Sequence, residues 1–491
     1  MVRRRPACVI VLWLASLSGA IVSAAASDEA PLLYQRNCSS CHGVDRRGTG
    51  LGPPLSEASY RYGGSREDIA RIIREGIPAQ GMPAFGETLS AAQVGALAAF
   101  LPARTPATGS DADAGGDPPP RRFDPVPGVV DTLDYAVRVE VFADGLETVW
   151  AMAFPDARTA LVTERPGRLR IIRDGVLDPR PVSGVPQVHV SSHRWNQGGL
   201  LDVALDPRHA ANGWVYLSYS HAPDAPGGEQ SPAMTRVVRG RIRDHAWVDQ
   251  ETVFEAPASS YGNAAWHYGG RIVIDGEARL HASVGDRGAM ERARDPGDAT
   301  GKIHRLLTDG RPAPDNPLAG RPGTLATVFS LGHRNPQGMA IEPGTGRIWA
   351  TEHGPRGGDE LNIVRGGADY GWPVASYGIN YDGTLLTPHT RLEGVEQPVH
   401  FWRPSIGVSG LAFYRGNEFP LWAGKLLVTA LGARELRLLT IDGERVQHEE
   451  VLFRSQGRPY EPVVGPDGAI YLVTDDPGRI LRLTAAAERR Q

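Results

Sequence analysis

Residues 331–373 concentrate side chains that could bind an anionic cofactor and a metal. They include an Arg-Asn pair, a Gly-Pro turn and two neighbouring carboxylates: Arg334, Asn335, Gly354, Pro355, Asp359 and Glu360. The Arg334 guanidinium is a planar fork that suits a carboxylate, and Asn335 adds a donor and an acceptor. Backbone carbonyls at a Gly-Pro turn, followed by acidic side chains, are hard oxygen ligands that suit Ca²⁺ better than zinc or copper. The stretch therefore predicts a flat, anionic cofactor bridged to calcium.

A second chemical motif lies near the N-terminus, where Cys38, Cys41 and His42 form the pattern C-S-S-C-H. Two thiols at this spacing can form thioethers to a haem, while the following histidine reaches the iron. The alternatives are a disulfide or half of a zinc site, but the remaining cysteine, Cys8, provides no second pair to complete a zinc shell. The motif predicts covalently attached haem c.

Met82, in the sequence G-M-P-A-F, is the predicted distal ligand of that haem iron. A buried methionine ordinarily fills core space. This one is the only methionine in the sequence between the haem motif and residue 130, and it lies on a Gly-Pro loop. Thioether ligation raises the potential of a haem towards that of an electron acceptor.

Residues 331–373 resemble the matching segment of the soluble glucose and aldose sugar dehydrogenases that depend on pyrroloquinoline quinone (PQQ). The resemblance extends over roughly residues 135–485, with several separated motifs in the same order. It implies that Arg334 and Asn335 contact PQQ and that the carbonyls of Gly354 and Pro355 bind its calcium. The alternative is an Arg-Asn pair that caps a propeller loop and a Gly-Pro pair that merely turns the chain.

The same resemblance assigns roles to six further residues. These are Gln197 near quinone and substrate, His267 as the catalytic base, Glu360 and the Tyr370 carbonyl at a second calcium, Tyr381 near the cofactor, and Arg458 on the cofactor. Taken singly, His267 could be a structural hydrogen-bonder, Gln197 a turn residue and Glu360 a solvated acid. The chain departs from the glucose dehydrogenases twice: Tyr460 stands where they carry a second arginine, and residues 432–434 lack their lysine.

The elements that must position these residues form a repeat. An apolar strand, a turn with Pro, Asp or Gly, and a second apolar strand recur six times, at residues 151–164, 202–220, 271–286, 338–354, 410–431 and 462–476. A spacing of roughly 50 to 70 residues is typical of propeller blades. The alternating Val137, Val139 and Val141 could pair with residues 480–483 and close the ring. We expect an all-β six-bladed β-propeller preceded by a small all-α cytochrome c domain.

The first domain resembles small class I c-type cytochromes over nearly its whole length. Ser65 with Asp68, and Ser90 with Gln93, mark the starts of two amphipathic helices. We expect the cytochrome domain at residues 27–104, a Pro/Gly/Asp-rich linker at 105–130 and the propeller at 131–486. The composition of the linker predicts a tether rather than a fixed connection.

The N-terminus predicts secretion. Three arginines at residues 3–5 precede an apolar run at 9–22 and small residues at 24–26, so residues 1–26 read as a signal peptide. An uncleaved anchor is the alternative, but the run is short for a bilayer span. We expect a soluble periplasmic protein without stable membrane insertion. The net charge of −4, without Lys/Arg blocks beyond the N-terminus, gives no reason to expect nucleic acid as a partner.

These features together imply a periplasmic quinohaemoprotein that oxidises a sugar at C1. His267 would take the hydroxyl proton while hydride passes to PQQ, and the tethered haem would receive the electrons for an external acceptor: a cytochrome, quinone or oxidase. Two alternatives remain: a PQQ enzyme for other alcohols or aldehydes, and a non-enzymatic ligand-binding propeller with a haem domain. The sequence fixes neither the sugar nor the oligomeric state.

Overall fold

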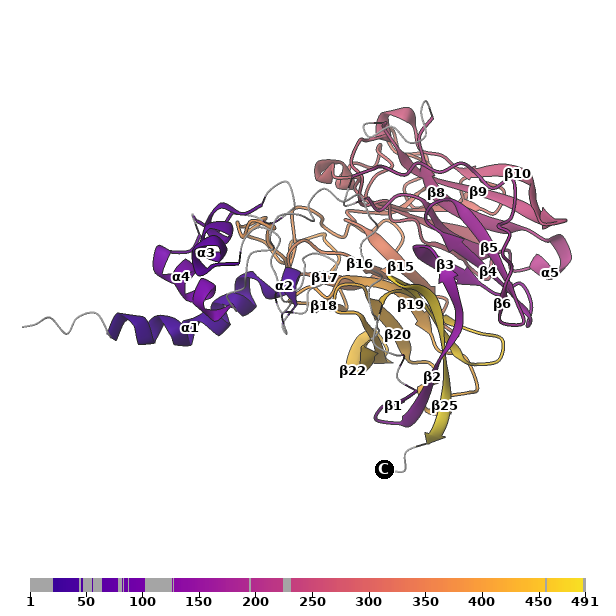
Figure 1. The fold of residues 1–491 in the computed structure, drawn as a ribbon. Coiled ribbons are helices and arrows are strands. Elements are labelled where there is room, and N and C mark those ends of the chain that lie inside the picture. Colours follow the sequence, from indigo (N-terminus) through magenta and orange to yellow (C-terminus); the bar gives the residue numbers. More distant parts are fainter. Residues whose placement is uncertain are drawn as a thin grey trace, which may run out of the picture. The chain divides into compact units, whose positions relative to one another are not determined.

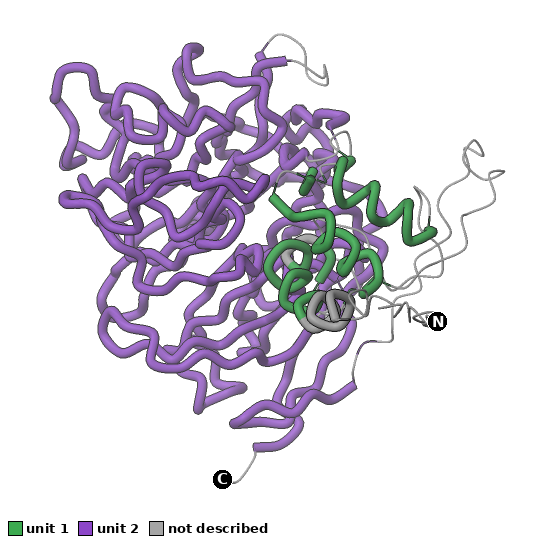
Figure 2. Tube along the Cα trace, turned by 90° about the vertical axis from the view of Figure 1, so that its left-hand side faces the viewer, with its two compact units in different colours: residues 1–115 green, residues 116–491 purple. Residues whose placement is uncertain are grey.

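The computed structural model describes residues 21–43, 46, 55, 64–77, 82, 84–86, 88–101, 126, 128–193, 196–223, 231–454 and 457–488. It divides into two compact units, residues 1–115 and 116–491, which Figure 2 colours separately. Most of the predicted signal peptide and most of the predicted linker lie outside the described residues. Their boundaries stay predictions.

The N-terminal unit is helical in its described part. Its helices are α1 (Ile21–Asn37), α2 (Ser39–His42), α3 (Arg66–Glu75) and α4 (Ala91–Phe100). Ser65 and Ser90 form the predicted capping boxes, in which each hydroxyl accepts from the backbone three residues on. The helices bury one apolar cluster that includes Leu33, Ile73 and Leu97. In the described part of the chain, no helix combines the length and the apolar character that a bilayer crossing requires.

The second unit consists of antiparallel sheets arranged as the blades of a propeller (Figure 1). Among the described residues there are six sheets, which confirms the predicted fold. Five of them are four-stranded, and their strands from the innermost outwards are β3 (Val149–Ala153), β4 (Thr159–Glu164), β5 (Arg168–Arg173) and β6 (Val176–Leu177); β7 (Leu200–Leu205), β8 (Val215–His221), β9 (Met234–Arg243) and β10 (Ala246–Phe254); β11 (Ile272–Ile274), β12 (Arg279–Val284), β13 (Lys302–Leu307) and β14 (Val328–Leu331); β15 (Pro336–Ile341), β16 (Ile348–Glu352), β17 (Asp359–Val364) and β18 (His400–Trp402); and β19 (Val408–Phe413), β20 (Leu426–Ala430), β21 (Glu435–Asp442) and β22 (Arg445–Arg454). Short helical turns lie in the connections, at α5 (His209–Asn212), η2 (Ala258–Ser260), η3 (Met290–Arg294) and η4 (Pro420–Trp422).

The sixth sheet joins the two ends of the propeller. It contains β23 (Arg458–Val464), β24 (Ile470–Asp475) and β25 (Gly478–Glu488), and then β2 (Tyr135–Leu146) and β1 (Val129–Asp131) from the start of the unit. Val139 pairs with Leu483 and Val141 with Leu481, so the predicted closing strand is present. Innermost strands contact one another in a closed ring, in the order β3, β7, β11, β15, β19, β23 and back to β3.

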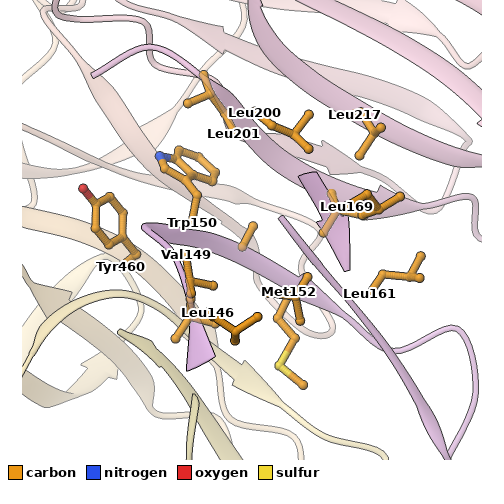
Figure 3. Close-up of a cluster of buried hydrophobic side chains, with 14 of the residues drawn as sticks. Leu146, Val149, Trp150, Met152, Leu161, Leu169, Leu200, Leu201, Leu217 and Tyr460 are labelled. Atoms are coloured by element: carbon orange, nitrogen blue, oxygen red, sulfur yellow. The ribbon is translucent and has the colours of Figure 1, made fainter. Parts of the chain in front are cut away.

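The propeller core lies between neighbouring sheets. Inner strands are buried on both faces, and β3 and β7 therefore read as nearly continuous apolar runs rather than as alternating patterns. Figure 3 shows the largest buried cluster, where Trp150 packs among Leu200, Leu201 and Tyr460 from three different sheets. Each blade therefore depends on its neighbours for burial, as expected for a propeller.

The closing strand makes a testable contribution to stability. Leu483 is fully buried opposite Val139, so Leu483→Ala should lower the unfolding free energy of the propeller by about 2–5 kcal/mol. Val141→Ala is the matched control, because Val141 lies on the same strand pair with 43% of its surface exposed, and its effect should stay within about 0.5 kcal/mol. Denaturant titration followed by intrinsic fluorescence measures both. Equal effects of the two substitutions would contradict closure through this strand.

Candidate active site

The predicted site residues come from segments far apart in the chain that begin the innermost strands. Gln197, His267 and the Arg334-Asn335 pair lie a few residues before β7, β11 and β15, and Arg458 is the first residue of β23. Because these strands surround one axis in the same sense, their starts lie at one mouth of the central channel. The second strand of each sheet runs back, so residues that follow β12 and β16 return to the same mouth. The fold itself therefore gathers the predicted residues.

His267 is held on three sides. Its backbone N–H donates to Oε1 of Gln197 at 2.8 Å, and its Nδ1 lies 2.7 Å from Oδ1 of Asp286. His267 has a φ of 60°, an uncommon backbone conformation for a residue other than glycine. At Gly285, a Cβ atom would lie 2.2 Å from the His267 carbonyl oxygen, so only glycine lets the end of the strand approach this loop.

The electrostatics of His267 favour a proton acceptor. Burial and the positive charge of Arg334 lower the pKa of His267, and these effects outweigh the opposing charge of Asp286. Burial alone would raise the pKa of Asp286, but the His267 imidazole and Arg334 hold it below its usual range, so this carboxylate is ionised. An ionised Asp286 fixes the proton on Nδ1 of His267. The neutral imidazole then presents the lone pair of Nε2, as a general base requires.

The Arg334-Asn335 pair lies beside this dyad. Arg334 donates from Nη1 to the carbonyl of His353 at 3.0 Å and from Nη2 to the Tyr381 hydroxyl at 3.4 Å. Its Nε is buried and has no hydrogen-bond partner. Oδ1 of Asn335 accepts from the backbone N–H of Gly269 at 3.0 Å, which ties the pair to the His267 loop. A buried guanidinium with an unused donor fits an anionic group that is absent from the structure.

The Gly-Pro turn follows β16 at the same mouth. Asp359 does not extend towards a metal here, because its Oδ1 accepts from the N–H of Gly354 and its Oδ2 accepts from three backbone N–H groups at residues 406–408. This carboxylate instead fixes the turn. The Pro355 carbonyl accepts one hydrogen bond from Ser405 at 3.2 Å, which leaves a second lone pair for a cation.

Glu360 is part of a buried acidic cluster rather than a solvated acid. Burial and the neighbouring Glu352 raise the pKa of Glu360 well above its usual range. Nδ2 of Asn362 donates to both carboxylates, while its Oδ1 is buried and has no hydrogen-bond partner. Glu352 in turn contacts His333, whose ring stacks on that of Tyr370 at 4.4 Å. Two carboxylates beside an unused amide oxygen fit a divalent cation.

Arg458 and Tyr460 have separate roles. The charge of Arg458 contributes to the lowered pKa of His353, so Arg458 is near the site, and its Nε is buried and has no hydrogen-bond partner. Tyr460 is only 5% exposed, and its ring packs against Trp150 at 6.5 Å. Tyr460 thus fills core space where the related glucose dehydrogenases carry an arginine.

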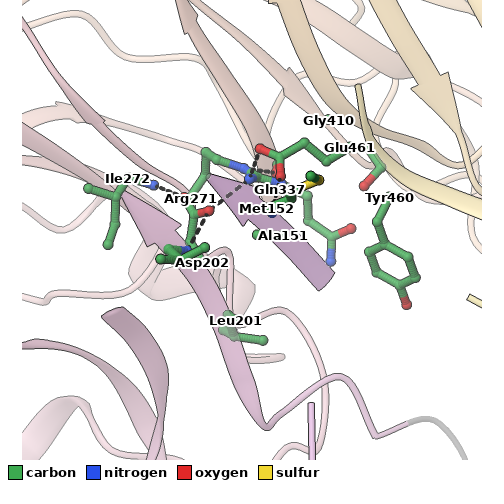
Figure 4. A network of polar contacts seen from close by, with 12 residues as sticks. Ala151, Met152, Leu201, Asp202, Arg271, Ile272, Gln337, Gly410, Tyr460 and Glu461 are labelled. Atoms are coloured by element: carbon green, nitrogen blue, oxygen red, sulfur yellow. Dashed lines mark hydrogen bonds and ion pairs between the residues drawn. The ribbon is translucent and has the colours of Figure 1, made fainter. Parts of the chain in front are cut away.

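Below the site, Arg271 joins several blades at the propeller axis (Figure 4). Its Nη1 binds Oδ1 of Asp202 at 2.9 Å and Oε1 of Glu461 at 2.5 Å, and its Nε donates to the Gln337 carbonyl at 3.0 Å. The guanidinium also lies 4.2 Å from the ring centre of Trp150. Glu461 lines a cavity of about 820 Å³ at the far ends of the inner strands. This network therefore lies between the predicted site and the second mouth of the channel.

The predicted haem ligands belong to the N-terminal unit. His42 is buried, and Cys38 and Met82 pack against the apolar cluster of that unit. Cys38 forms no disulfide. The side chain of Cys41 lies outside the described part of the structure. Their roles stay predictions.

Two residues at the site were missed by the sequence analysis. Asp286 ends the third repeat, in the sequence S-V-G-D, and its polar character at the end of an apolar strand was the available signal. Trp372 donates from Nε1 to Oδ2 of Asp286 at 2.7 Å, although the two residues are 86 positions apart. Nothing in a single sequence indicates that contact.

Comparison with known proteins agrees with this geometry. The fold and the site define the chain as a sugar dehydrogenase of the six-bladed propeller class. Residues 146–482 match the glucose/sorbosone dehydrogenase family, and the chain belongs to that family. Residues 25–101 match the family of subunit III of cbb3-type cytochrome c oxidase.

Individual relatives cover the two units separately. The aldose sugar dehydrogenase YliI of Escherichia coli is 40% identical over 71% of this chain and 93% of its own length. The crystal structure of the E. coli enzyme in its apo form has a TM-score of 0.66 at 39% identity, and covers 71% of this chain and 99% of that one. The PQQ-bound aldose sugar dehydrogenase of Streptomyces coelicolor has a TM-score of 0.57 at 27% identity, over 71% and 98%. Subunit CcoP of the cbb3-type oxidase of Azospirillum brasilense is 30% identical over 18% of this chain and 32% of its own length.

The Arg271 network predicts a pH dependence of stability. Burial and Asp202 raise the pKa of Glu461 from 4.5 to about 7, although Arg271 opposes the shift. A carboxyl whose pKa is higher in the folded state contributes stability below pH 4.5 and loses it as the pH rises through 7. Glu461→Gln keeps a hydrogen-bonding side chain and removes the titration. Calorimetry should therefore show a smaller fall in the propeller Tm between about pH 5 and pH 8 in this variant. An unchanged fall would show that Glu461 does not titrate in this range.

Proposed function

We propose that the protein is a periplasmic quinohaemoprotein that oxidises an aldose at C1 to a lactone, with PQQ and Ca²⁺ in the propeller and haem c in the N-terminal unit. The observation that carries the proposal is the His267-Asp286 dyad beside a buried Arg334 with an unused donor. The dyad supplies a base, and the guanidinium supplies a place for an anionic redox cofactor.

The residues present fit PQQ, which is a flat molecule with several carboxylates. Arg334, Asn335 and Arg458 would hold its anionic edge, with Gln197 and Tyr381 alongside. Two buried guanidinium Nε atoms without hydrogen-bond partners, on Arg334 and Arg458, support this placement. Bound PQQ supplies the acceptor for the two electrons that leave the sugar C1 as hydride. The missing second arginine and lysine predict weaker binding than in the glucose dehydrogenases.

Calcium would bind at two places. The carbonyls of Gly354 and Pro355 suit the ion beside PQQ, because Asp359 already fixes their turn through backbone hydrogen bonds. Glu360 and the Tyr370 carbonyl suit the second ion, which would neutralise the Glu352-Glu360 pair. A divalent cation at this pair removes the cost of burying two like charges.

In the proposed reaction His267 takes the proton of the C1 hydroxyl on Nε2. Asp286 stabilises the imidazolium that results, because its ionised carboxylate already binds Nδ1. The C1–H bond breaks as the C1=O bond of the lactone forms, so two electrons and two protons leave each sugar. Burial keeps His267 neutral and ready to accept the next proton.

The N-terminal unit would carry the electrons onwards. Cys38 and Cys41 would attach the haem, and His42 and Met82 would bind its iron. Because the two units are one chain, the haem is present at high effective concentration near the propeller. The proposed partners are a small-molecule sugar and an external electron acceptor in the periplasm.

His267→Ala tests the proposed reaction. A positioned general base contributes about 10²- to 10⁴-fold, so sugar-dependent turnover per bound PQQ should fall by that factor. The PQQ content should stay near wild type, because Arg334, Asn335 and the Gly-Pro carbonyls remain. His448→Ala, at an exposed position on β22, is the matched control and should leave turnover unchanged. Turnover per bound PQQ within a few-fold of wild type would remove His267 from the mechanism.

A further inference from the structure

Asp286 is the residue through which the rest of the site controls His267, and its two oxygens are held very differently. Oδ1 accepts from the backbone N–H of Gly288 at 2.8 Å and contacts Nδ1 of His267. For Oδ2, the hydrogen-bond donor that the described residues provide is Nε1 of Trp372, at 2.7 Å. The carboxylate is about 1% exposed, so bulk water does not replace that donor. The orientation of Asp286 therefore depends on a single indole N–H.

Other indole–carboxylate contacts of this propeller are built differently. Trp402 donates to Oε1 of Glu449 at 2.8 Å, and the same oxygen binds Arg437 at 2.6 Å. Oε2 of Glu342 likewise accepts both from Trp349 and from Arg347, and Oδ2 of Asp134 accepts from Trp422 and Lys425. In these three pairs a cation holds the carboxylate, and the indole adds a second bond. At Oδ2 of Asp286 the indole replaces the cation.

The same indole also contacts the cofactor side of the site. The guanidinium carbon of Arg334 lies 5.2 Å from the centre of the Trp372 ring, in cation–π geometry. The backbone N–H of Trp372 donates to the carbonyl of Gly332 at 2.9 Å, and the backbone N–H of Asp286 donates to the carbonyl of Arg334 at 2.8 Å. One side chain thus bonds Asp286 with its edge and supports Arg334 with its face.

We propose that Trp372 is a positioning residue for sugar oxidation, which acts by locking the Asp286 carboxylate against His267 through its indole N–H. The N–H bond to Oδ2 fixes the rotation of the carboxylate, so that Oδ1 faces Nδ1 and Nε2 points towards the substrate. The aromatic face is a separate function, which supports Arg334. The inference rests on the proposed function, since it assigns Trp372 a part in the same reaction.

Trp372→Phe separates the edge from the face, because phenylalanine keeps an aromatic ring for Arg334 and lacks the N–H. An unsatisfied buried carboxylate oxygen destabilises the present orientation of Asp286. We expect kcat per bound PQQ to fall about tenfold, while KM for the sugar and Kd for PQQ stay within about twofold of wild type. Trp402→Phe is the matched control: it loses the same kind of bond, but Glu449 keeps Arg437, and all three constants should stay unchanged.

A second readout needs neither PQQ nor turnover. A crystal structure of the full-length Trp372→Phe variant without cofactor should show Asp286 rotated, with its Oδ1 beyond about 3.5 Å from Nδ1 of His267, outside hydrogen-bonding distance. This measurement tells failure of the inference apart from failure of the proposed function, because the dyad is judged even in a protein that oxidises no sugar.

The outcomes divide cleanly. An intact dyad in the crystal overturns the proposal, as does a kcat within twofold of wild type. A parallel loss of PQQ affinity with kcat unchanged also overturns it, because Trp372 would then act through Arg334. If the phenylalanine variant does not fold, β-(3-benzothienyl)alanine at position 372 keeps the bicyclic shape and replaces only the N–H by sulfur. The same losses are expected of it, and the same results would overturn the proposal.

Discussion

The buried guanidinium of Arg271 is the interaction on which the rest of the propeller site depends. It bridges Asp202 and Glu461 from β7 and β23, donates to the carbonyl of Gln337 at the start of β15, and stacks on Trp150 of β3. A charge held this far from water is stable only when its partners come from all sides. Arg271 also follows His267 by four positions, so the axis of the propeller and the base share one short loop.

This arrangement explains how a rigid scaffold produces a neutral base next to positive charge. Burial and Arg334 disfavour protonation of His267, while Asp286 fixes which nitrogen carries the proton. A similar division of work occurs at the Gly-Pro turn, where Asp359 binds backbone N–H groups and leaves carbonyl oxygens for a cation. Protein carboxylates thus position the binding groups, while the proposed cofactors would complete the charge balance.

Much of the architecture could be predicted from sequence, because it depends on local patterns. The repeated strand pairs predicted six blades, and the alternation at Val137, Val139 and Val141 predicted the strand that closes the ring. Side-chain contacts between blades could not be predicted. The bond between Trp372 and Asp286 joins residues 86 positions apart, and no periodicity records it. Family resemblance identified the residues near the quinone but not those that hold them in place.

The central claim is that one chain oxidises a sugar in its propeller and delivers the electrons to its own haem. Stopped-flow spectroscopy of the full-length protein, loaded with PQQ and Ca²⁺ and mixed with an aldose, tests this most directly. The account predicts that the haem is reduced at a first-order rate that does not change when the protein is diluted, and that reduction is lost when PQQ is omitted. Haem that stays oxidised in the loaded protein, or that is reduced at a rate proportional to protein concentration, would contradict it.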